Sequence, residues 1–330
     1  MSRIALRSPY FFTHTIGGAS GAVSVQLTIT IDTVLRYTLS KAVTAGSPTV
    51  FEVSELCRDY LTVNYDGSPT AGDTEIDIDL VMTFYDSSDN LITTINDTGN
   101  QGFDAYGYFD EGANYEPPYP LSSAASWLIA PKLGVNNDWE IFVPENKSGY
   151  LPYILSGNVA YQSYSGTATS VTIGVGVTCD INRTPCSKYE PQRITFVNKY
   201  GQFQDLWFLL KKTLTTDTTK EEYQGINLTS SGSSTTYDTS KATKVLYNKE
   251  SKQRITLNSG YYPEAYNAVF EQLLESEQVW IQFLNAVGQT QYLPVNVMTS
   301  SFVEKTKLND KLIDYTIEFA EAYDKINNIR

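Results

Sequence analysis

The chain has 330 residues, of which 41% are hydrophobic and 18% are charged, and its net charge at pH 7 is -13. This length allows two or three domains that each bury a core, and the acidity argues against a basic nucleic-acid-binding face. The 24 tyrosines, together with plentiful Thr, Ser and Val, favour strands over helices.

Strict alternation of apolar and polar side chains is the main structural signal in the first third of the chain. Residues 23–31 and 76–84 place an apolar side chain at every second position, which predicts strands with one buried and one solvated face. Turn residues at 86–90 and a return at 91–95 predict a hairpin. Residues 171–177 and 313–319 alternate in the same way and predict two further strands.

One helix is predicted near the end of this β-rich pattern. Pro263 suits a first helical position, and apolar residues follow from Tyr266 to Leu274 at helical spacing. We expect a helix over 263–276 packed on the last sheet, and a short helical turn within 53–61. The fold class is therefore mainly β, with two or three antiparallel β-sandwich-like domains, the last with one flanking α-helix.

Composition shifts divide the chain. The proline-rich segment 115–120 cannot continue a central strand, so we predict an N-terminal β-sandwich over 1–114. Residues 115–190 form a middle β-domain or an extension of the first, and 191–330 form a C-terminal β-sandwich. Two stretches, 214–220 and 229–241, are rich in Ser and Thr. The second is a long mobile excursion, which is either a contact arm or an uninvolved loop.

Residues 193–212 are the most distinctive segment. A strand over 194–197, a tight turn over 198–201 and a strongly aromatic return strand over 203–210 predict a hairpin with an apolar face large enough to anchor a domain. Gly201 is suited to the positive φ that such a turn requires. The candidate interface or anchor residues are Phe196, Tyr200, Gly201, Phe203, Trp207 and Phe208.

Signs of catalytic chemistry are sparse. His14 is the single histidine, and the three cysteines, Cys57, Cys179 and Cys186, do not have the spacing of a closed metal site. Cys179 and Cys186 are close enough to pair across a turn, but free thiols of a reducing compartment are the preferred interpretation. The sequence contains no nucleophile elbow, phosphate-binding loop or dinucleotide fingerprint. We therefore predict no enzyme, and no catalytic, cofactor-binding or metal-binding residues.

Acidic and aromatic side chains leave two alternatives open. Asp77 and Asp79 lie on one strand face, and carboxylates at 104, 110 and 111 could contribute oxygens to Ca²⁺, although a solvated surface is the simpler interpretation. The aromatic stretch 103–109 has the composition of a sugar-stacking surface, with Tyr106 and Tyr108 as candidates. Such aromatics also seal sandwich edges and subunit interfaces.

The sequence also shows no secretory signal and no membrane-spanning segment. Residues 1–12 do not combine a charged start with an apolar stretch, and apolar runs are too short to cross a membrane. We expect synthesis in a cytoplasm and no membrane partner.

Four stretches resemble a family of tailed-bacteriophage virion proteins from phages of marine and gut Bacteroidetes. They are FEVSELCRDYL at 51–61, FDAYGYFDEGAN at 103–114, CSKYEPQRITFVNKYGQFQDLWFLLKK at 186–212 and LNDKLIDYTIEFAEAYDKI at 308–326. The resemblance implies a virion component of the tail or neck that assembles as a ring, and it brings no catalytic residues.

The leading hypothesis is thus a structural virion subunit whose sheet edges and loops join copies of itself and other virion proteins. DNA could pass nearby without specific binding, with Asp77 and Asp79 lining its path. The alternative is a carbohydrate-binding or receptor-binding module at the tail tip. A third hypothesis, an acidic glycan hydrolase, requires two carboxylates that face each other across a cleft.

Overall fold

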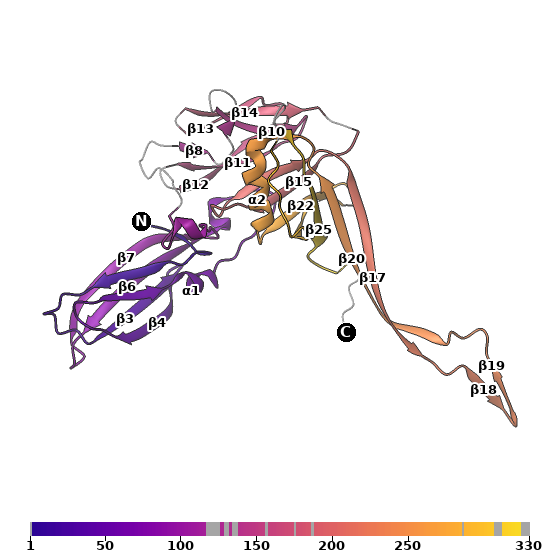
Figure 1. The fold of residues 1–330 in the computed structure, drawn as a ribbon, viewed down its shortest axis with the longest axis horizontal. Helices are drawn as coiled ribbons and strands as arrows, with labels where there is room; N and C mark the ends of the chain where they lie inside the picture. The colour runs from indigo at the N-terminus through magenta and orange to yellow at the C-terminus, as the bar shows by residue number, and fades with distance from the viewer. Residues whose placement is uncertain are drawn as a thin grey trace.

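The computed structural model describes residues 2–116, 126–128, 132–133, 138–155, 158–174, 176–185, 188–285, 287–306 and 312–324. They form a mainly β structure, as predicted, with an N-terminal unit, a middle unit and a C-terminal sheet that carries a helix. A long two-stranded arm projects from the C-terminal sheet (Figure 1).

The N-terminal unit (residues 2–114) has two sheets around one core. The larger sheet has the order β1-β7-β6-β3-β4, with β1 parallel to β7 and the other pairs antiparallel. The β2–β5 pair and α1 contribute the opposing side of the core. The bounds are β1 Arg3–Ala5, β2 Phe11–Thr15, β3 Ser24–Ile31, β4 Val34–Ala42, β5 Pro48–Glu52, α1 Ser54–Arg58, β6 Glu75–Tyr85 and β7 Leu91–Phe103.

Alternation in β3 and β6 corresponds to burial. Every second side chain from Val25 to Ile31 and from Ile76 to Phe84 is buried. Because successive strand side chains point to opposite faces, one face packs on the core and the other faces outward. The hairpin predicted over 76–95 is confirmed as β6–β7, and the helical turn predicted within 53–61 is α1.

The middle unit consists of two small sheets, ordered β13-β14-β10-β9 and β12-β11-β8. Its largest apolar cluster is continuous with that of the C-terminal sheet, whereas Ile154 and Val159 meet Phe103 of the N-terminal unit in a smaller cluster. The bounds are β8 Ser126–Leu128, β9 Lys132–Leu133, β10 Asp138–Pro144, β11 Gly149–Leu155, β12 Asn158–Tyr164, β13 Ser170–Ile173 and β14 Val177–Thr184. The predicted boundary at 115–120 falls mostly outside the described residues.

The single strand predicted over 171–177 is wrong. The structure ends β13 at Ile173 and begins β14 at Val177, and the two strands pair antiparallel. Gly174 and Gly176 both have positive φ, at 48° and 82°. Glycine adopts this conformation at little cost, so the apparent polar positions of the alternation are the turn of a hairpin.

The C-terminal sheet has seven strands in the order β16-β15-β22-β23-β25-β20-β17. The bounds are β15 Gln192–Val197, β16 Phe203–Phe208, β17 Lys212–Gln224, β20 Lys244–Asn258, β22 Val279–Leu284, β23 Thr290–Val297 and β25 Thr316–Glu321. The strand predicted over 313–319 is divided into β24 (Leu312–Ile313), which pairs with β21 (Tyr262–Pro263), and β25. Its four apolar side chains are nevertheless all buried, as the alternation predicts.

The helix predicted over 263–276 is confirmed with a different first turn. Glu264–Tyr266 form a 3₁₀ turn and α2 spans Asn267–Glu275. Phe270 is fully buried and packs edge-on against Phe208 of β16, with ring centroids 6.4 Å apart. The helix therefore covers the sheet at the predicted hairpin.

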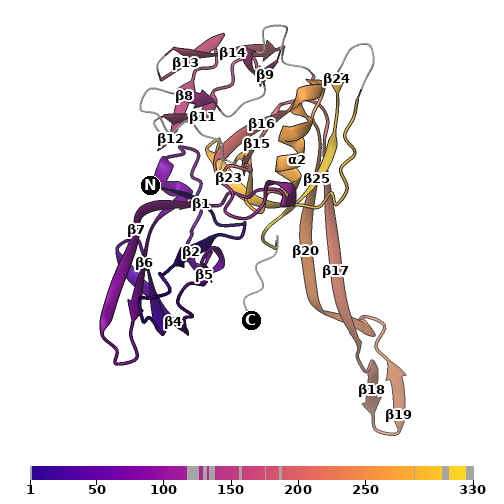
Figure 2. The same ribbon diagram turned by 60° about the vertical axis from the view of Figure 1, so that its left-hand side comes forward.

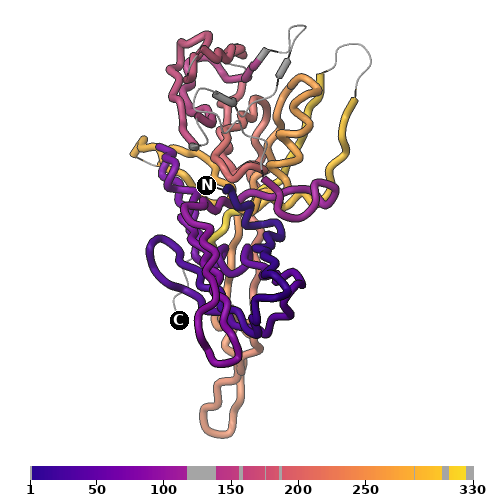
Figure 3. Tube along the Cα trace, turned by 90° about the vertical axis from the view of Figure 1, so that its left-hand side faces the viewer, coloured from indigo at the N-terminus to yellow at the C-terminus, as the bar shows by residue number. Residues whose placement is uncertain are grey.

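The Ser/Thr-rich stretch 214–220 lies within a strand, and 229–241, predicted to be a long mobile excursion, contains most of a short β-hairpin. They belong to an arm (residues 212–258) in which β17 pairs with β20 over their full length, and β18 (Leu228–Ser231) pairs with β19 (Ser234–Tyr237) at the tip. At about 3.3 Å per residue, β17 alone extends for roughly 43 Å. Figures 1 and 2 show the arm and the N-terminal unit on opposite sides of the C-terminal sheet, and Figure 3 shows both extending away from the middle unit.

Candidate functional site

The predicted β15–β16 hairpin lies at the centre of the molecule. Phe196, Phe203, Trp207 and Phe208 are each at most 4% exposed, and Tyr200 is half-buried. These side chains therefore serve as an internal anchor. The turn of the hairpin, with Gly201, reaches out of the C-terminal sheet to the N-terminal unit.

The contact at that turn is made by backbone. Gly201 has a φ of +73°, and a Cβ at this position would lie 2.9 Å from the Cβ of Phe103. Beside it, Tyr200 forms an antiparallel bridge with Ala105. Only glycine satisfies both the left-handed conformation and the close approach.

An aromatic cluster forms a second contact. Tyr65, from the segment after α1, places its ring 4.9 Å from Phe203, 5.5 Å from Trp280 and 5.1 Å from Tyr292, measured between centroids. Gly67 packs so closely on Tyr292 that a Cβ would lie 2.1 Å from its ring. The N-terminal unit therefore contributes a ring to the C-terminal sheet.

A buried ion pair lies beside this cluster. Arg193 donates to the Asp205 carboxylate at 2.6 Å and to the Tyr65 hydroxyl at 3.0 Å, while Thr195 donates to Asp205 at 2.7 Å. The Arg193 and Asp205 side chains are 5% and 6% exposed. Burial alone would lower the pKa of Arg193, but the Asp205 carboxylate holds it above its usual range. Removing one partner of such a pair leaves an uncompensated buried charge.

Tyr106 and Tyr108, the candidate glycan-stacking residues, join the N-terminal unit to the end of α2. Tyr106 donates to the Glu275 carboxylate at 2.6 Å, and Tyr108 donates to the same oxygen at 3.4 Å. The Arg7 guanidinium lies 4.7 Å from the Tyr106 ring centre, and the Lys199 ammonium lies 3.9 Å from that of Tyr108. Both rings thus have cationic partners within the molecule, and glycan stacking on them stays a prediction.

The contacts of Gly201 with Phe103, of Tyr65 with the C-terminal sheet and of Tyr106 with Glu275 form the junction between the N-terminal unit and the C-terminal part of the chain. Charged residues complete this junction. Arg58 and Arg7 both form ion pairs with Glu277, and the Arg58 guanidinium also lies 4.0 Å from Asp104. The Asp104 carboxyl is buried, and burial raises its pKa to about 6 despite the two arginines. Burial thus moves the pKa of the Asp104 carboxyl toward neutral pH.

Two of the three carboxylates considered as calcium ligands, those at 104, 110 and 111, lie beside cationic side chains in the structure. Asp104 faces Arg58, and Glu111 forms an ion pair with Lys199 at 2.7 Å, while Asp110 is exposed. Across the described residues, His, Cys, Asp and Glu side chains do not gather in threes as metal ligands.

The structure also shows the surroundings of the single histidine and of two of the three cysteines. His14 lies on β2 with its ring 5.7 Å from that of Phe84. Cys57 and Cys179 are buried free thiols, and burial raises the pKa of each to about 12. Cys186 lies outside the described residues, so the alternative of a Cys179–Cys186 pair falls outside them as well.

Several junction residues were not identified from sequence. Tyr65, Glu275 and Glu277 lie in segments whose local pattern indicates only a loop or the end of a helix. Their roles arise from contacts between positions far apart in the chain, such as Tyr106 with Glu275.

The arm presents an exposed apolar surface far from this junction. Six large side chains in its outer part (residues 223–249, the outer arm) are at least half exposed: Tyr223, Ile226, Leu228, Tyr237, Leu246 and Tyr247. At its base, Arg254 forms ion pairs with Asp217 of β17 and Glu318 of β25, which ties the arm to the sheet. A register shift between Glu221 and Glu222 leaves Tyr247 as the extra residue of a β-bulge, a feature that bends a strand.

The sequence matches no protein-family model and no curated protein. Among the described helices, none has the length and hydrophobicity needed to span a membrane.

Replacing Gly201 with alanine tests the backbone contact. The left-handed conformation costs an alanine about 1–2 kcal/mol, and the collision with Phe103 adds about 1–3 kcal/mol. Gly21→Ala is the matched control, because Gly21 has the same φ of +73° with open space around it. Urea unfolding should show the larger loss of stability for Gly201→Ala, and equal losses would contradict the close contact.

The pKa of Asp104 predicts a pH dependence. Because its pKa rises from 3.8 to about 6 on folding, the folded protein binds a proton that the unfolded chain releases between these values. Stability should therefore increase as pH falls from 7 to 4, by on the order of 2 kcal/mol from this group. Asp104→Asn should remove this gain in chemical denaturation at each pH, whereas the exposed Asp110→Asn should retain it. An unchanged pH dependence in Asp104→Asn would contradict the assignment.

Proposed function

We propose that this chain is a structural subunit of a tailed-phage virion, and that it forms a ring in the tail or neck. The observation that carries the proposal is the arm. A monomer with this fold exposes an extended hairpin, and a partner in an assembly would cover it.

The structure of the arm favours binding to a partner. An isolated two-stranded hairpin is marginally stable in water. Beyond Arg254, β20 pairs with β17 and has no other partner strand in the described chain. Exposed apolar side chains such as Ile226, at 88% exposure, and Tyr237, at 75%, lie beyond that point. A concentration of large exposed apolar side chains on one element favours an interaction site.

The junction supports an assembly role in a second way. Gly201, Tyr65 and Glu275 hold the N-terminal unit against the C-terminal sheet by backbone, ring and carboxylate contacts. A subunit whose parts are held in one geometry can repeat the same contact from copy to copy. When the fixed rotation between copies divides a full turn evenly and has no rise along its axis, such a head-to-tail contact closes into a ring.

The acidity of the chain is compatible with a ring around a DNA path. Asp77 is exposed on the outward face of β6, and Asp79 on the same face accepts a hydrogen bond from Gly99. Carboxylates that face DNA would repel its phosphates and prevent specific binding. The proposed partners are further copies of the chain and other virion proteins, and the proposed location is the virion after synthesis in the host cytoplasm.

A shortened arm tests the proposal. In the variant, residues 220–249 are replaced by Asn-Gly, which joins Thr219 to its strand partner Glu250 through a two-residue turn. Light scattering after size-exclusion chromatography should give a multi-subunit mass for the intact chain and a monomer mass for the variant. Negative-stain images of the intact chain should show rings.

Circular dichroism and thermal unfolding of the shortened chain provide the folding control, because the junction and core are untouched. A strictly monomeric intact chain at its highest soluble concentration would contradict the proposal. Assembly that persists without the outer arm would also contradict it.

A further inference from the structure

The outer arm and the N-terminal unit carry opposite charge. The outer arm has three lysines, Lys241, Lys244 and Lys249, and one acidic residue, Asp238, for a net charge of +2. Residues 2–114 have fifteen acidic and five basic side chains, for a net charge of -10. The outer arm is thus a basic element of a chain whose N-terminal unit is strongly acidic.

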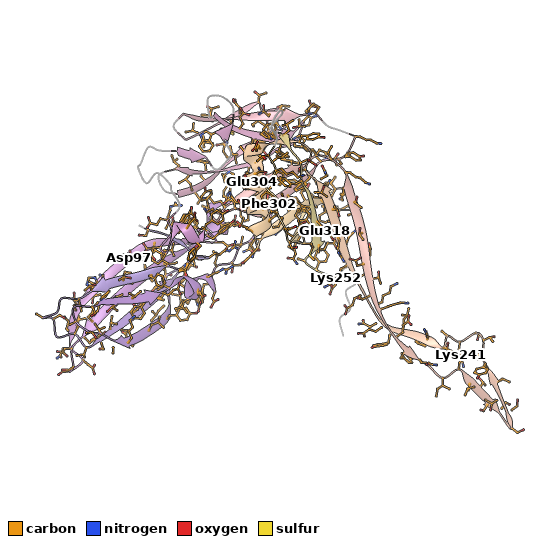
Figure 4. The ribbon with its side chains drawn as sticks, in the orientation of Figure 1. Asp97, Lys241, Lys252, Phe302, Glu304 and Glu318 are labelled. Carbon is orange, nitrogen blue, oxygen red and sulfur yellow. The ribbon has the colours of Figure 1, made fainter. Side chains whose placement is uncertain are left out.

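These two parts cannot meet within one copy. They project on opposite sides of the C-terminal sheet (Figures 1 and 2). Figure 4 labels Asp97 on the N-terminal unit and Lys241 on the outer arm, and the two lie on opposite flanks of the molecule. Their complementary charges are therefore available to a second copy.

One patch on the N-terminal unit combines acidic and apolar groups as the outer arm combines basic and apolar groups. Thr30 of β3 pairs with Leu35 on one side and with Asp79 on the other. Directly opposed residues share a face of a sheet, so Leu35 and Asp79 flank Thr30 on the outward face. Leu35 is 58% exposed, and Asp77 lies on the same face at the next outward position of β6.

The end of the β3–β4 hairpin extends this patch. Asp32 accepts a hydrogen bond from the Asp77 backbone at 3.0 Å. Val34 pairs directly with the buried Ile31, so it belongs to the opposite face. Leu35 lies on β4, the last strand in the order of its sheet, whereas Asp77 and Asp79 lie on β6, two strands in from that edge. The outward patch of Asp32, Leu35, Asp77 and Asp79 therefore runs from the sheet edge, where a strand from another chain can approach, onto the face of the sheet.

We infer that the outer arm of one copy docks on the Asp32–Leu35–Asp77–Asp79 patch of the next copy. The arm's lysines face the three carboxylates, and its exposed tyrosines, leucines and isoleucine cover Leu35. Because donor and acceptor surfaces differ, the contact is head-to-tail, which is the type that closes rings. This inference rests on the proposed ring assembly and names the surface that forms it.

Charge reversal on each side tests the docking. Lys241→Glu with Lys244→Glu, or Asp77→Lys with Asp79→Lys, should each raise the concentration needed for assembly by about tenfold or more, because like charges then oppose each other. Combining all four changes in one chain should restore assembly. Glu55→Lys with Asp110→Lys is the control: it makes the same charge change at exposed positions of the N-terminal unit away from the patch, and should assemble as the unaltered chain does.

Carbodiimide cross-linking supplies an independent readout, since it joins lysine amines to carboxylates in contact. A mixture of ¹⁵N-labelled and unlabelled chains distinguishes links between copies. Links from Lys241, Lys244 or Lys249 to Asp32, Asp77 or Asp79 of the other copy are expected. If rings form but link elsewhere, and the four-residue combination does not restore assembly, the docking inference is wrong and the ring proposal stands. If the unaltered chain does not assemble, both are wrong.

Discussion

The close approach of Gly201 to Phe103 is the contact on which the rest of the molecule depends. It brings a turn of the C-terminal sheet against the backbone of the N-terminal unit at a distance that permits no side chain. The Tyr65 ring and the Tyr106–Glu275 hydrogen bond then fix the rotation of one part against the other. With that orientation set, the arm and the N-terminal unit lie on opposite sides of the C-terminal sheet (Figures 1 and 2). A subunit with two different surfaces on separate sides can join its copies head to tail.

Stability and specificity are divided between the core and the junction. The largest apolar cluster runs from the middle unit through the C-terminal sheet to α2 and supplies most of the buried hydrophobic surface there. The junction instead uses a buried ion pair, Arg193 with Asp205, and a buried carboxyl, Asp104. Buried charges add little net stability, but Arg193 also donates to the Tyr65 hydroxyl and Asp104 lies beside Arg58, so these contacts form in one arrangement of the partners. Their contribution here is a defined orientation of the N-terminal unit.

Sequence patterns predicted the parts of the fold that depend on local periodicity. β3, β6 and α2 were found because their side chains repeat at two-residue or helical spacing, and Gly201 was found because a tight turn needs positive φ. A contact arm at 229–241 was one of the two alternatives, but its strands were missed because Ser/Thr content was taken as a loop signal, although Thr is also a common strand residue. The strand over 171–177 was wrong because Gly174 and Gly176 occupied the polar positions of an alternation. The junction was not predictable, because the partners of Tyr106 and Gly201 lie far away in sequence.

An electron cryomicroscopy map of the assembled full chain tests the central claim most directly. We expect a closed ring in which each arm leaves its own C-terminal sheet and lies on the outward face of β3, β4 and β6 of the next copy, with the junction geometry unchanged. A ring built by other surfaces with the arms exposed to solvent, or a two-fold dimer in which like surfaces meet, would contradict it.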